Sequence, residues 1–476
     1  VHIKTCVGLT ALERVTNIYS GRRMASLLEE NVFFMWLSGM SRPDFRTINR
    51  FRSERLADGR FESIFRQVVE LLHEEGLVSL DVQYIDGTKI ESVANKYTFV
   101  WKGSVEKNKA KLIAKVDGVL KAAEAVLEEE NADEPQEEIT KEDLQKRTDR
   151  ILEKMDEEGV SDKKLRKAVS KIKEESLPKL DEYDKHLEIL GERNSYSKTD
   201  PDATFMHMKE DAMNNGQTKP GYNVQIATEN QYIVNYDLYW RPTDYGTLIP
   251  FLESFYEKFG FYSSEIVADS GYGSEQNYEF MFANGMTPYV KYNMFHKEMK
   301  RKFLKNPFHQ ANMFYNQEQD FYVCPMGQHM EHVTDKKIVS DLGYVSHTSV
   351  YKAANCSGCP LRGMCYNGKG DRRTIEVNHR ANSFKSSAKA LLTSDRGLMH
   401  RSKRPIEPES CFGNIKFNHG FKRFHLKSTR KTKVEWGLVS LAHNLRKYVA
   451  YKTKLKKKQA QSMVLVLEKP ALKPAV

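Results

Sequence analysis

Two stretches of apolar and β-branched residues each end in an aspartate that is followed by glycine or by Ser-Gly. The first, SLDVQYIDGTKIES, carries Asp86, and the second, SEIVADSGYGS, carries Asp269. Neighbouring strands lie about 4.8 Å apart, so carboxylates at adjacent strand ends project into one cleft. Asp before Gly is also ordinary turn chemistry, and for a lone Asp-Gly the turn is the better interpretation. Two such sites in this strand order favour a shared carboxylate site.

The order of strand-like and helix-like segments predicts an α/β fold. Apolar, β-branched runs predict strands at 81–90, 221–228, 232–239, 265–269 and 287–291, and amphipathic runs predict helices at 245–259 and 275–283. Three strands followed by helix, strand, helix and strand, interrupted by insertions and closed by a long helix, match an RNase H-like core.

A third carboxylate is expected near the start of PESCFGNIKFNHGFKRF, where Glu407 and Glu409 are the candidates. Glu409 leads directly into the predicted helix, and Lys416 lies seven residues on, two turns along the same face. Glu407 precedes Pro408, which favours an extended backbone. We therefore choose Glu409, with Lys416 placed to meet a phosphate. Three carboxylates suit a pair of Mg²⁺ or Mn²⁺ ions, because hard cations prefer oxygen ligands.

Charge is distributed unevenly along the 476 residues, whose formal net charge is +10. Residues 401–458 hold 17 Lys or Arg against 3 Asp or Glu, whereas residues 124–190 hold 13 against 22. This segregation predicts a basic surface for a polyanion and a separate acidic arm. A solvated basic tail explains residues 452–458. It explains the preceding segment poorly, because its Lys and Arg, including Lys422 and Arg423, alternate with aromatic residues (Phe412, Phe417, Phe421, Phe424).

Two further segments predict helices. SRPDFRTINRFRSERL has a Ser-Pro entry signal and places Arg46, Asn49, Arg50 and Arg52 along one short helix, the profile of a helix that enters a DNA groove. Surface helices with several Arg are also common. The acidic insertion at about 108–190 keeps apolar residues at spacings of three and four, so we expect a coiled-coil hairpin with a corner near Pro135.

Four cysteines, in VCPMG and NCSGCPLRGMC, form a second candidate site. Cys324, Cys356, Cys359 and Cys365 offer four thiolates for a tetrahedral structural Zn²⁺. The alternative is a set of reduced cysteines in a loop-rich subdomain. Cys6 and Cys411 are expected to be packing residues. For Asp200 and Asp202, in SKTDPDATF, a turn around Pro201 is favoured over a supporting metal contact.

Composition places the chain among soluble proteins of a reducing, cytoplasmic compartment. No apolar run approaches the roughly 18 residues of a membrane span. Six clustered cysteines and the absence of a signal-peptide h-region also argue against secretion. Because the chain begins with Val1 rather than Met, we expect a truncated or disrupted amino terminus.

The motifs resemble the DDE transposases of bacterial insertion sequences, most closely the eleven-eighty-two family. The matching segments are NIYSGRRMASLLEENVFFMWLSG, RPDFRTINRFR, YIDGTKIES, SKTDPDA, KPGYNVQIA, VADSGYGS, CPLRGMC, PESCFGNIKFNHGFKRFHLKS and AHNLRKY. The resemblance implies that D, D and E are Asp86, Asp269 and Glu409, that Mg²⁺ or Mn²⁺ is the cofactor, and that a Glu-x6-Lys element falls on Glu409 and Lys416. It also implies a bacterial, nucleoid-associated protein.

Two departures from that family stand out. Related enzymes place a tyrosine and an arginine before the glutamate, but Ser402 and Pro405 occupy those positions here, with Arg404 one residue away. The region before Asn17 does not resemble the family either.

These observations together predict six segments. They are a helical DNA-binding domain at 1–78, an RNase H-like core at 79–107 and 196–295, a charged helical hairpin at 108–195, a Cys-rich zinc-ribbon-like insertion at 296–395, a closing catalytic helix at 396–450 and a basic tail at 451–476.

The expected function is that of a transposase which binds double-stranded DNA at the element's terminal repeats, cleaves it and joins the freed 3′-hydroxyl to target DNA. Bringing two ends together implies self-association on DNA. Two alternatives remain. One is a non-catalytic DNA-binding protein, either a helix-turn-helix regulator with a zinc ribbon or an inactive transposase. The other is an RNase H-like nuclease that cuts without joining.

Overall fold

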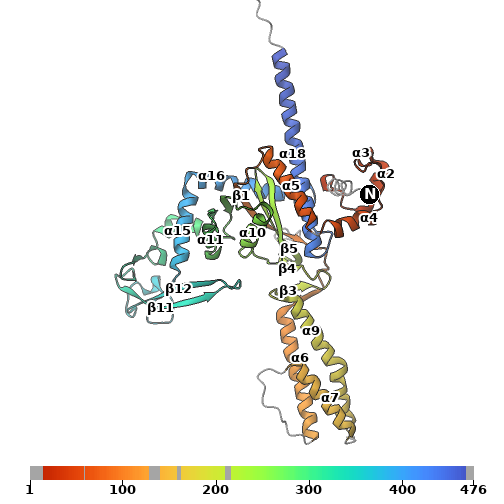
Figure 1. Ribbon diagram of the computed structural model, residues 1–476. Coiled ribbons are helices and arrows are strands. Elements are labelled where there is room, and N and C mark those ends of the chain that lie inside the picture. Colours follow the sequence, from red (N-terminus) through yellow and green to blue (C-terminus); the bar gives the residue numbers. More distant parts are fainter. Residues whose placement is uncertain (1–13, 58, 128–139, 158–161, 209–215, 468–476) are drawn as a thin grey trace, which may run out of the picture. The chain divides into compact units, whose positions relative to one another are not determined.

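A computed structural model describes residues 14–57, 59–127, 140–157, 162–208 and 216–467 (Figure 1). The chain forms two compact units, which are described separately. Unit 1 comprises Val1–Thr88, Asn223–Lys422 and Arg430–Val476, and unit 2 comprises Lys89–Tyr222 and Arg423–Thr429. Cys6 and the corner expected near Pro135 lie outside the described residues.

The centre of unit 1 is a mixed β-sheet. Its strands are β1 (Val82–Glu91), β5 (Thr218–Glu229), β6 (Tyr232–Tyr239), β7 (Glu265–Ala268) and β8 (Thr287–Val290), in the spatial order β6-β5-β1-β7-β8. The β5–β6 pair is antiparallel, whereas β1–β7 and β7–β8 are parallel. The strands predicted from the sequence are therefore confirmed. Strands β5 and β6 are buried over most of their length, including polar residues such as Asn223, Gln225 and Asn235.

Helices pack on this sheet through apolar faces. They are α5 (Arg60–Glu74), α10 (Leu248–Phe259), α11 (Glu275–Ala283) and α18 (Thr429–Leu467). Helix α18 approaches the sheet at Gly437, where an added Cβ would lie 2.3 Å from Tyr236 Oη and 2.4 Å from a ring carbon of Phe61. Only glycine allows this close approach, so Gly437 fixes the distance between α18, β6 and α5.

The predicted closing helix at 396–450 is wrong as a single element. The chain forms α15 (His379–Thr393), α16 (Asp395–Lys403), a π-helix η4 (Pro405–Glu409), α17 (Ser410–Gly413), a second π-helix η5 (Asn414–Asn418) and, after a break, α18. Pro408 lies inside η4, and Gly420 in the break has a φ of +68°. Proline cannot donate an intrahelical hydrogen bond, which fits the change to π-helical turns at η4, and glycine readily adopts positive φ, so the helical run ends just before Gly420.

The amino-terminal helices confirm the predicted helical character of this region. They are α2 (Gly21–Glu30), α3 (Val32–Leu37), α4 (Phe45–Arg50) and the π-helix η1 (Phe51–Arg55). Ser20, Asn31 and Asp44 cap α2, α3 and α4 by accepting backbone N–H bonds. Helix α3 leaves the side chains of Phe33 and Trp36 largely exposed.

A second sheet follows the strands of the first sheet in sequence. Short helices α12 (Phe295–Glu298), α13 (Arg301–Leu304) and the 3₁₀ turn η3 (Gln310–Asn312) lead into it. Its strands are β9 (Phe314–Asn316), β10 (Phe321–Val323), β11 (His329–Val339), β12 (Val345–Ala353) and β13 (Thr374–Val377), with α14 (Arg362–Cys365) before the last. The sheet has the order β13-β12-β11-β10-β9 and is antiparallel throughout.

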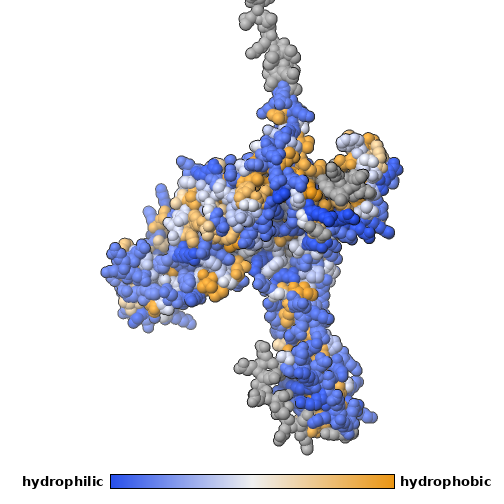
Figure 2. All heavy atoms as spheres, in the orientation of Figure 1, coloured by the Kyte–Doolittle hydropathy of each residue, from blue (hydrophilic) through white to orange (hydrophobic). Residues whose placement is uncertain are grey.

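Unit 2 is mainly helical. Its helices are α6 (Lys102–Val126), α7 (Lys141–Glu157), α8 (Lys163–Lys171), the π-helix η2 (Ile172–Ser176) and α9 (Leu177–Leu190). Strands β2 (Phe99–Trp101) and β3 (Ser195–Ser197) pair antiparallel at its base, and β4 (Thr204–His207) pairs with residues 218–221 of β5. Figure 2 shows a mostly hydrophilic surface over α6, α7 and α9.

The predicted two-armed coiled-coil hairpin is therefore wrong in its number of arms. Each helical segment of unit 2 contributes to one apolar core, which includes Leu120, Ile151, Val169 and Leu180. Arg147 lies within this bundle and donates to Glu124 and Asp117. Three helical arms, formed by α6, by α7 and by the continuous run from α8 to α9, bury more apolar surface as a bundle than two of them would as a pair. None of the described helices meets the length and hydropathy needed to cross a membrane.

The close approach at Gly437 gives a testable expectation. Gly437→Ala should lower the free energy of unfolding of unit 1 by about 1–3 kcal/mol, because the new methyl group overlaps Tyr236 and Phe61. Gly118→Ala in α6 is the matched control, since nothing lies within 4 Å of its Cβ position. It should leave stability unchanged or raise it by up to about 1 kcal/mol. Equal effects of the two changes in thermal unfolding would contradict this packing.

Candidate active site

The sheet register brings the two predicted aspartates together. Tyr84 of β1 is paired with Val267 of the parallel strand β7, and Asp86 and Asp269 each lie two residues further on. Asp86 Oδ1 accepts a hydrogen bond of 2.9 Å from the Gly87 N–H, and Asp269 Oδ1 accepts one of 2.7 Å from the Gly271 N–H. Both carboxylates therefore lie at the same edge of the β1–β7 pair.

The turn interpretation of Asp86-Gly87 is wrong, because β1 continues through Gly87 to Glu91. The role of Gly87 is steric. A Cβ at Gly87 would lie 2.1 Å from Gln225 Nε2 and 2.6 Å from Asp244 Oδ1. The backbone after Asp86 thus touches a polar pair supplied by β5 and the segment after β6.

Asp244 is a fourth carboxylate that sequence reasoning missed. Its Oδ1 accepts hydrogen bonds of 2.9 Å from Asn223 Nδ2 and from Gln225 Nε2, and the Tyr272 hydroxyl donates to Gln225 Oε1. A Cβ at Gly271 would lie 3.0 Å from Asp269 Oδ1 and 3.6 Å from Asp244 Oδ2. Asp244 therefore lies beside Asp269. One sequence feature could have indicated a polar group here. Two amide residues, Asn223 and Gln225, lie two residues apart on β5 and therefore on the same face of the strand.

Glu409 and Glu407 have different surroundings. Glu407 is buried and accepts a 2.6 Å hydrogen bond from the Gln231 N–H, which directs it away from the aspartates. It is helical, within η4, so the extended backbone predicted before Pro408 is wrong. The Glu409 side chain is 53% exposed, and its Oε1 accepts from Arg404 Nη1 at 3.1 Å. Of the two glutamates, Glu409 is therefore the one that shares the Arg404 cation with Asp86 and Asp269.

Arg404 links the three carboxylates. Its Nη2 lies 3.2 Å from Asp86 Oδ1 and 3.5 Å from Asp269 Oδ2, and its Nη1 lies 3.1 Å from Glu409 Oε1. The side chain is only 10% exposed. A guanidinium presents its donors in a fixed plane, so one arginine can bond several carboxylates at once. Three negative charges from three distant segments thus surround one cation.

The surroundings of Asp86 change its proton affinity. Burial raises the pKa of the Asp86 carboxyl to about 6, and the charges of Asp269 and Asp244 act in the same direction. Arg404 and the Gly87 N–H partly offset this rise in pKa. A buried carboxylate surrounded by other acids is poised to accept a cation.

Lys416 lies at this site but not on an open surface. It is 6% exposed, and its Nζ donates a 2.6 Å hydrogen bond to Thr88 Oγ1, two residues after Asp86. The expected α-helical face shared with Glu409 is wrong, because both residues lie in π-helical turns. Burial of Lys416 also argues against the predicted direct role on an accessible phosphate.

The other predicted DNA-binding residues differ in accessibility. Arg46 and Arg50 are exposed on α4, whereas Arg52 is 5% exposed and donates to Asn49 Oδ1 at 3.1 Å. Lys422 is exposed beside the Phe417 ring. In unit 2, Arg423 donates to the carbonyl oxygens of Ser92 and Ala94. Burial of Arg52 therefore argues against its predicted direct DNA contact, whereas the predicted contact of the partly buried Asn49 stays a prediction.

The interleaved aromatic residues also have a packing role. Phe412, Phe421 and Phe424 are buried, and among the four only Phe417 is largely exposed, at 62%. The alternation of aromatic and basic residues thus reflects an amphipathic segment, with aromatic rings in the core and cations outside.

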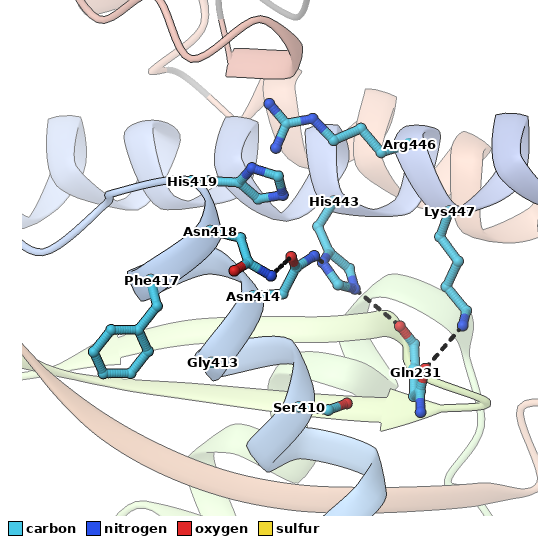
Figure 3. Close-up of a pocket in the computed structure, with 10 residues that line it drawn as sticks. All are labelled: Gln231, Ser410, Gly413, Asn414, Phe417, Asn418, His419, His443, Arg446 and Lys447. Atoms are coloured by element: carbon cyan, nitrogen blue, oxygen red, sulfur yellow. Dashed lines mark hydrogen bonds between the residues drawn. The ribbon is translucent and has the colours of Figure 1, made fainter.

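A polar cavity of about 680 Å³ lies between the α17–η5 segment and α18 (Figure 3). Its lining includes His419, His443, Arg446 and Lys447, and no carboxylate is among the described residues that line it. Lys447 Nζ and His443 Nε2 hold the loop residue Gln231 through its side-chain and backbone oxygens, each at 3.0 Å. Its cations and histidines make this cavity suited to anions.

The remaining predicted residues fall into two groups. The four cysteines of the second candidate site line one small cavity of about 20 Å³. Asp200 in unit 2 is buried and accepts hydrogen bonds from Ser92, Tyr222 and Ser428, and Asp202 accepts one from Thr429. These bonds are structural, so a supporting metal contact by Asp200 or Asp202 has no basis here. Cys411 is fully buried, which fits its expected packing role.

Within the described ranges, no three or more His, Cys, Asp or Glu side chains stand in an arrangement that could hold a metal ion as they are placed. At the carboxylate group, the Arg404 guanidinium occupies the position between the acids.

Two segments of the chain match models of transposase domains. Residues 323–449 match the model of a transposase DDE domain, and residues 1–54 match that of a transposase domain (DUF772). The first match contains Arg404, Glu409 and the four clustered cysteines, and the second contains α2–α4. The second match also begins at residue 1, so it includes the stretch before Asn17 that had seemed unlike the family. The chain therefore carries transposase domains. No curated protein and no solved structure matches it.

His419 gives a pH-dependent expectation for the polar cavity. Burial, with Arg446 and His443 nearby, lowers the pKa of His419 to about 4, and its two buried ring nitrogens lack hydrogen-bond partners among the described residues. Between pH 6.5 and 4 the unfolded chain binds a proton here that the folded chain does not, so stability falls as the pH falls through this window. His419→Leu should reduce the difference between the melting temperatures at pH 7 and pH 5. An unchanged difference would show that His419 is not the responsible group.

Proposed function

We propose that this chain is a DNA transposase in which Asp86, Asp269 and Glu409 form a DDE site that holds Mg²⁺ or Mn²⁺. The observation that carries the proposal is the convergence of these carboxylates, from β1, β7 and η4, on the single guanidinium of Arg404. The sheet order β6-β5-β1-β7-β8, with parallel β1, β7 and β8, supports an RNase H-like core around this site. Membership of the eleven-eighty-two family stays a prediction.

The donor set suits a hard divalent cation. All three side chains offer carboxylate oxygens, which Mg²⁺ and Mn²⁺ prefer, and they already share a cation. Their present spacing fits the wide guanidinium rather than a small ion. Metal binding therefore requires Arg404 to leave the space between the carboxylates. The half-exposed Glu409 side chain has room to move toward the metal ions.

In this account Asp86, Asp269 and Glu409 would hold the metal ions and Asp244 would position Asp269. When bound, the ions would make a water or a DNA 3′-hydroxyl nucleophilic and stabilise the oxygens of an in-line displacement at phosphorus. Asn223 and Gln225 keep Asp244 Oδ1 hydrogen-bonded, so its Oδ2 stays on the Asp269 side. Once displaced, the Arg404 cation would be free to pair with a phosphate of the DNA.

Exposed cations would bind the DNA backbone. Arg46, Arg50 and Lys422 are accessible, and the cavity that contains Arg446 and Lys447 adds positive charge beside the α17–η5 segment. Contacts of this kind make binding strongly dependent on salt and independent of base sequence. Self-association follows from the need to hold two DNA ends at once.

Removal of one metal-binding carboxylate tests the catalytic assignment. Asp269→Asn should lower Mg²⁺-dependent nicking and joining of DNA that carries the element's terminal repeats by roughly 100-fold or more, because metal stabilisation of the transition state is worth several kcal/mol. Binding of the same DNA should persist. Asp81→Asn is the matched control, since Asp81 is exposed next to the other end of β1.

The results of this binding, nicking and joining assay distinguish the proposed transposase from the two alternative functions. Wild-type binding without any Mg²⁺-dependent cleavage would indicate a DNA-binding regulator or an inactive transposase. Cleavage without joining would indicate a nuclease. Retained joining by the Asp269→Asn chain would refute the assigned site.

Arg404→Ala tests the competition between arginine and metal. Without metal, the variant should lose about 1–2 kcal/mol of stability, because three partly buried like charges lose their shared partner. Mn²⁺ should then raise its melting temperature more than it raises that of the wild type, since no cation has to be displaced. Lys403→Ala, which removes a neighbouring exposed charge, should behave like the wild type. An equal Mn²⁺ response of Arg404→Ala and wild type would contradict the competition.

A further inference from the structure

The second sheet of unit 1 has a small hydrophobic core for its size. Strand β11 exposes ten of its eleven residues and buries only Met330. The buried core beneath the sheet consists of a few residues (Met313, Tyr322, Met330, Tyr351, Ala353, Ile375, Val377). Small sheets with so little buried apolar surface usually need a disulfide or a metal for stability. All four cysteines of this region are free thiols.

The first of these cysteines lies in a tight turn after β10. The Gly327 N–H donates to the Cys324 carbonyl at 2.8 Å, and the Cys324 N–H donates to the Gln328 carbonyl at 2.9 Å. Gly327 has a φ of +81°, which glycine adopts without strain. The Cys-Pro-Met-Gly turn therefore projects one sulfur from a fixed backbone loop.

The second and third cysteines form a similar turn after β12. The Cys359 N–H approaches the Cys356 carbonyl at 3.4 Å, the Arg362 N–H donates to the Cys359 carbonyl at 3.1 Å, and Gly358 has a φ of +71°. Cys365 follows in α14, where its N–H donates to the Leu361 carbonyl at 2.9 Å. Two glycine-containing turns and one helical turn thus bring four cysteines to one place.

All four side chains line the same cavity of about 20 Å³. That volume is close to the space of one small ion or water molecule. The lining offers sulfur from every cysteine but no carboxylate and no histidine among the described residues. Soft thiolate ligands in a set of four favour Zn²⁺ with tetrahedral geometry over Mg²⁺ or Mn²⁺.

Arg373 supplies hydrogen bonds to two of the sulfurs. Its backbone N–H donates to Cys356 Sγ at 3.3 Å, and its Nη1 donates to Cys365 Sγ at 2.8 Å, while its Nη2 donates to the Phe308 carbonyl at 2.6 Å. Donors of this kind orient metal-bound thiolates and balance their charge.

We propose that Cys324, Cys356, Cys359 and Cys365 bind one structural Zn²⁺, with Arg373 as a positioning residue. The sulfurs are not at ligand spacing as placed, so zinc binding requires the thiols to turn further toward the cavity that they line. The ion would join the turn after β10 to the segment between β12 and β13 and so stabilise the second sheet. This inference does not depend on the DDE site.

Zinc content of the purified full-length chain tests the proposal without DNA or activity. We expect one zinc per chain by elemental mass spectrometry, released by a thiol-blocking mercurial and detected with a metallochromic dye. Cys356→Ser and Cys365→Ser should each remove most of it. Cys411→Ser is the matched control, because Cys411 is buried elsewhere, where its thiol donates to the Gln231 carbonyl. It should retain zinc.

Two further measurements test zinc binding without removal of a cysteine, in case the cysteine variants do not fold. Arg373→Met keeps all four sulfurs, so it should bind zinc but lose it to a chelator several-fold faster than the wild type. Replacement of zinc by Co²⁺ in the wild type should give thiolate-to-cobalt charge-transfer absorption. A wild-type chain that holds no zinc after reconstitution and gives no such absorption, or that contains disulfides among these cysteines, would overturn the proposal.

Discussion

The rest of the site depends on the ion pairs between the Arg404 guanidinium and three carboxylates, at 3.1–3.5 Å. Each acid comes from a different part of the chain, so their approach without a cation would cost electrostatic free energy. The parallel β1–β7 pair sets the distance between Asp86 and Asp269, and the η4 turn adds both Arg404 and Glu409. Arg404 thus holds the three carboxylates in one arrangement. To bind there, a pair of small cations would have to displace Arg404 and bring the carboxylates into a different arrangement.

A second constraint is the dense polar layer under the aspartates. Asp244, fixed by Asn223 and Gln225, lies against the backbone at Gly87 and Gly271, where a Cβ would meet its oxygen atoms or its partners. Gly87 therefore lets β1 pass close to Asp244, whereas Gly271 lies in the turn after β7. The charges of Asp244 and Asp269 contribute to the raised pKa of Asp86.

Much of the fold could be predicted from periodicity, because strands such as 232–239 and helices such as 275–283 keep one pattern from end to end. Sequence reasoning also selected the three acids that lie around Arg404. It missed Asp244 and the burial of Lys416, since both depend on contacts between segments far apart in sequence. It also expected α-helical spacing across 405–418, where two π-helices and Pro408 change the register. Local patterns cannot report such tertiary effects.

The central claim is that Arg404 and divalent metal compete for Asp86, Asp269 and Glu409. A crystal structure of the full-length chain with Mn²⁺ and terminal-repeat DNA, with Mn²⁺ located by its anomalous scattering, tests it most directly. The account predicts manganese peaks about 2.1 Å from oxygens of all three carboxylates, with the Arg404 guanidinium moved out from between them. Manganese bound elsewhere, with Arg404 still in contact with the three acids in the DNA complex, would contradict it.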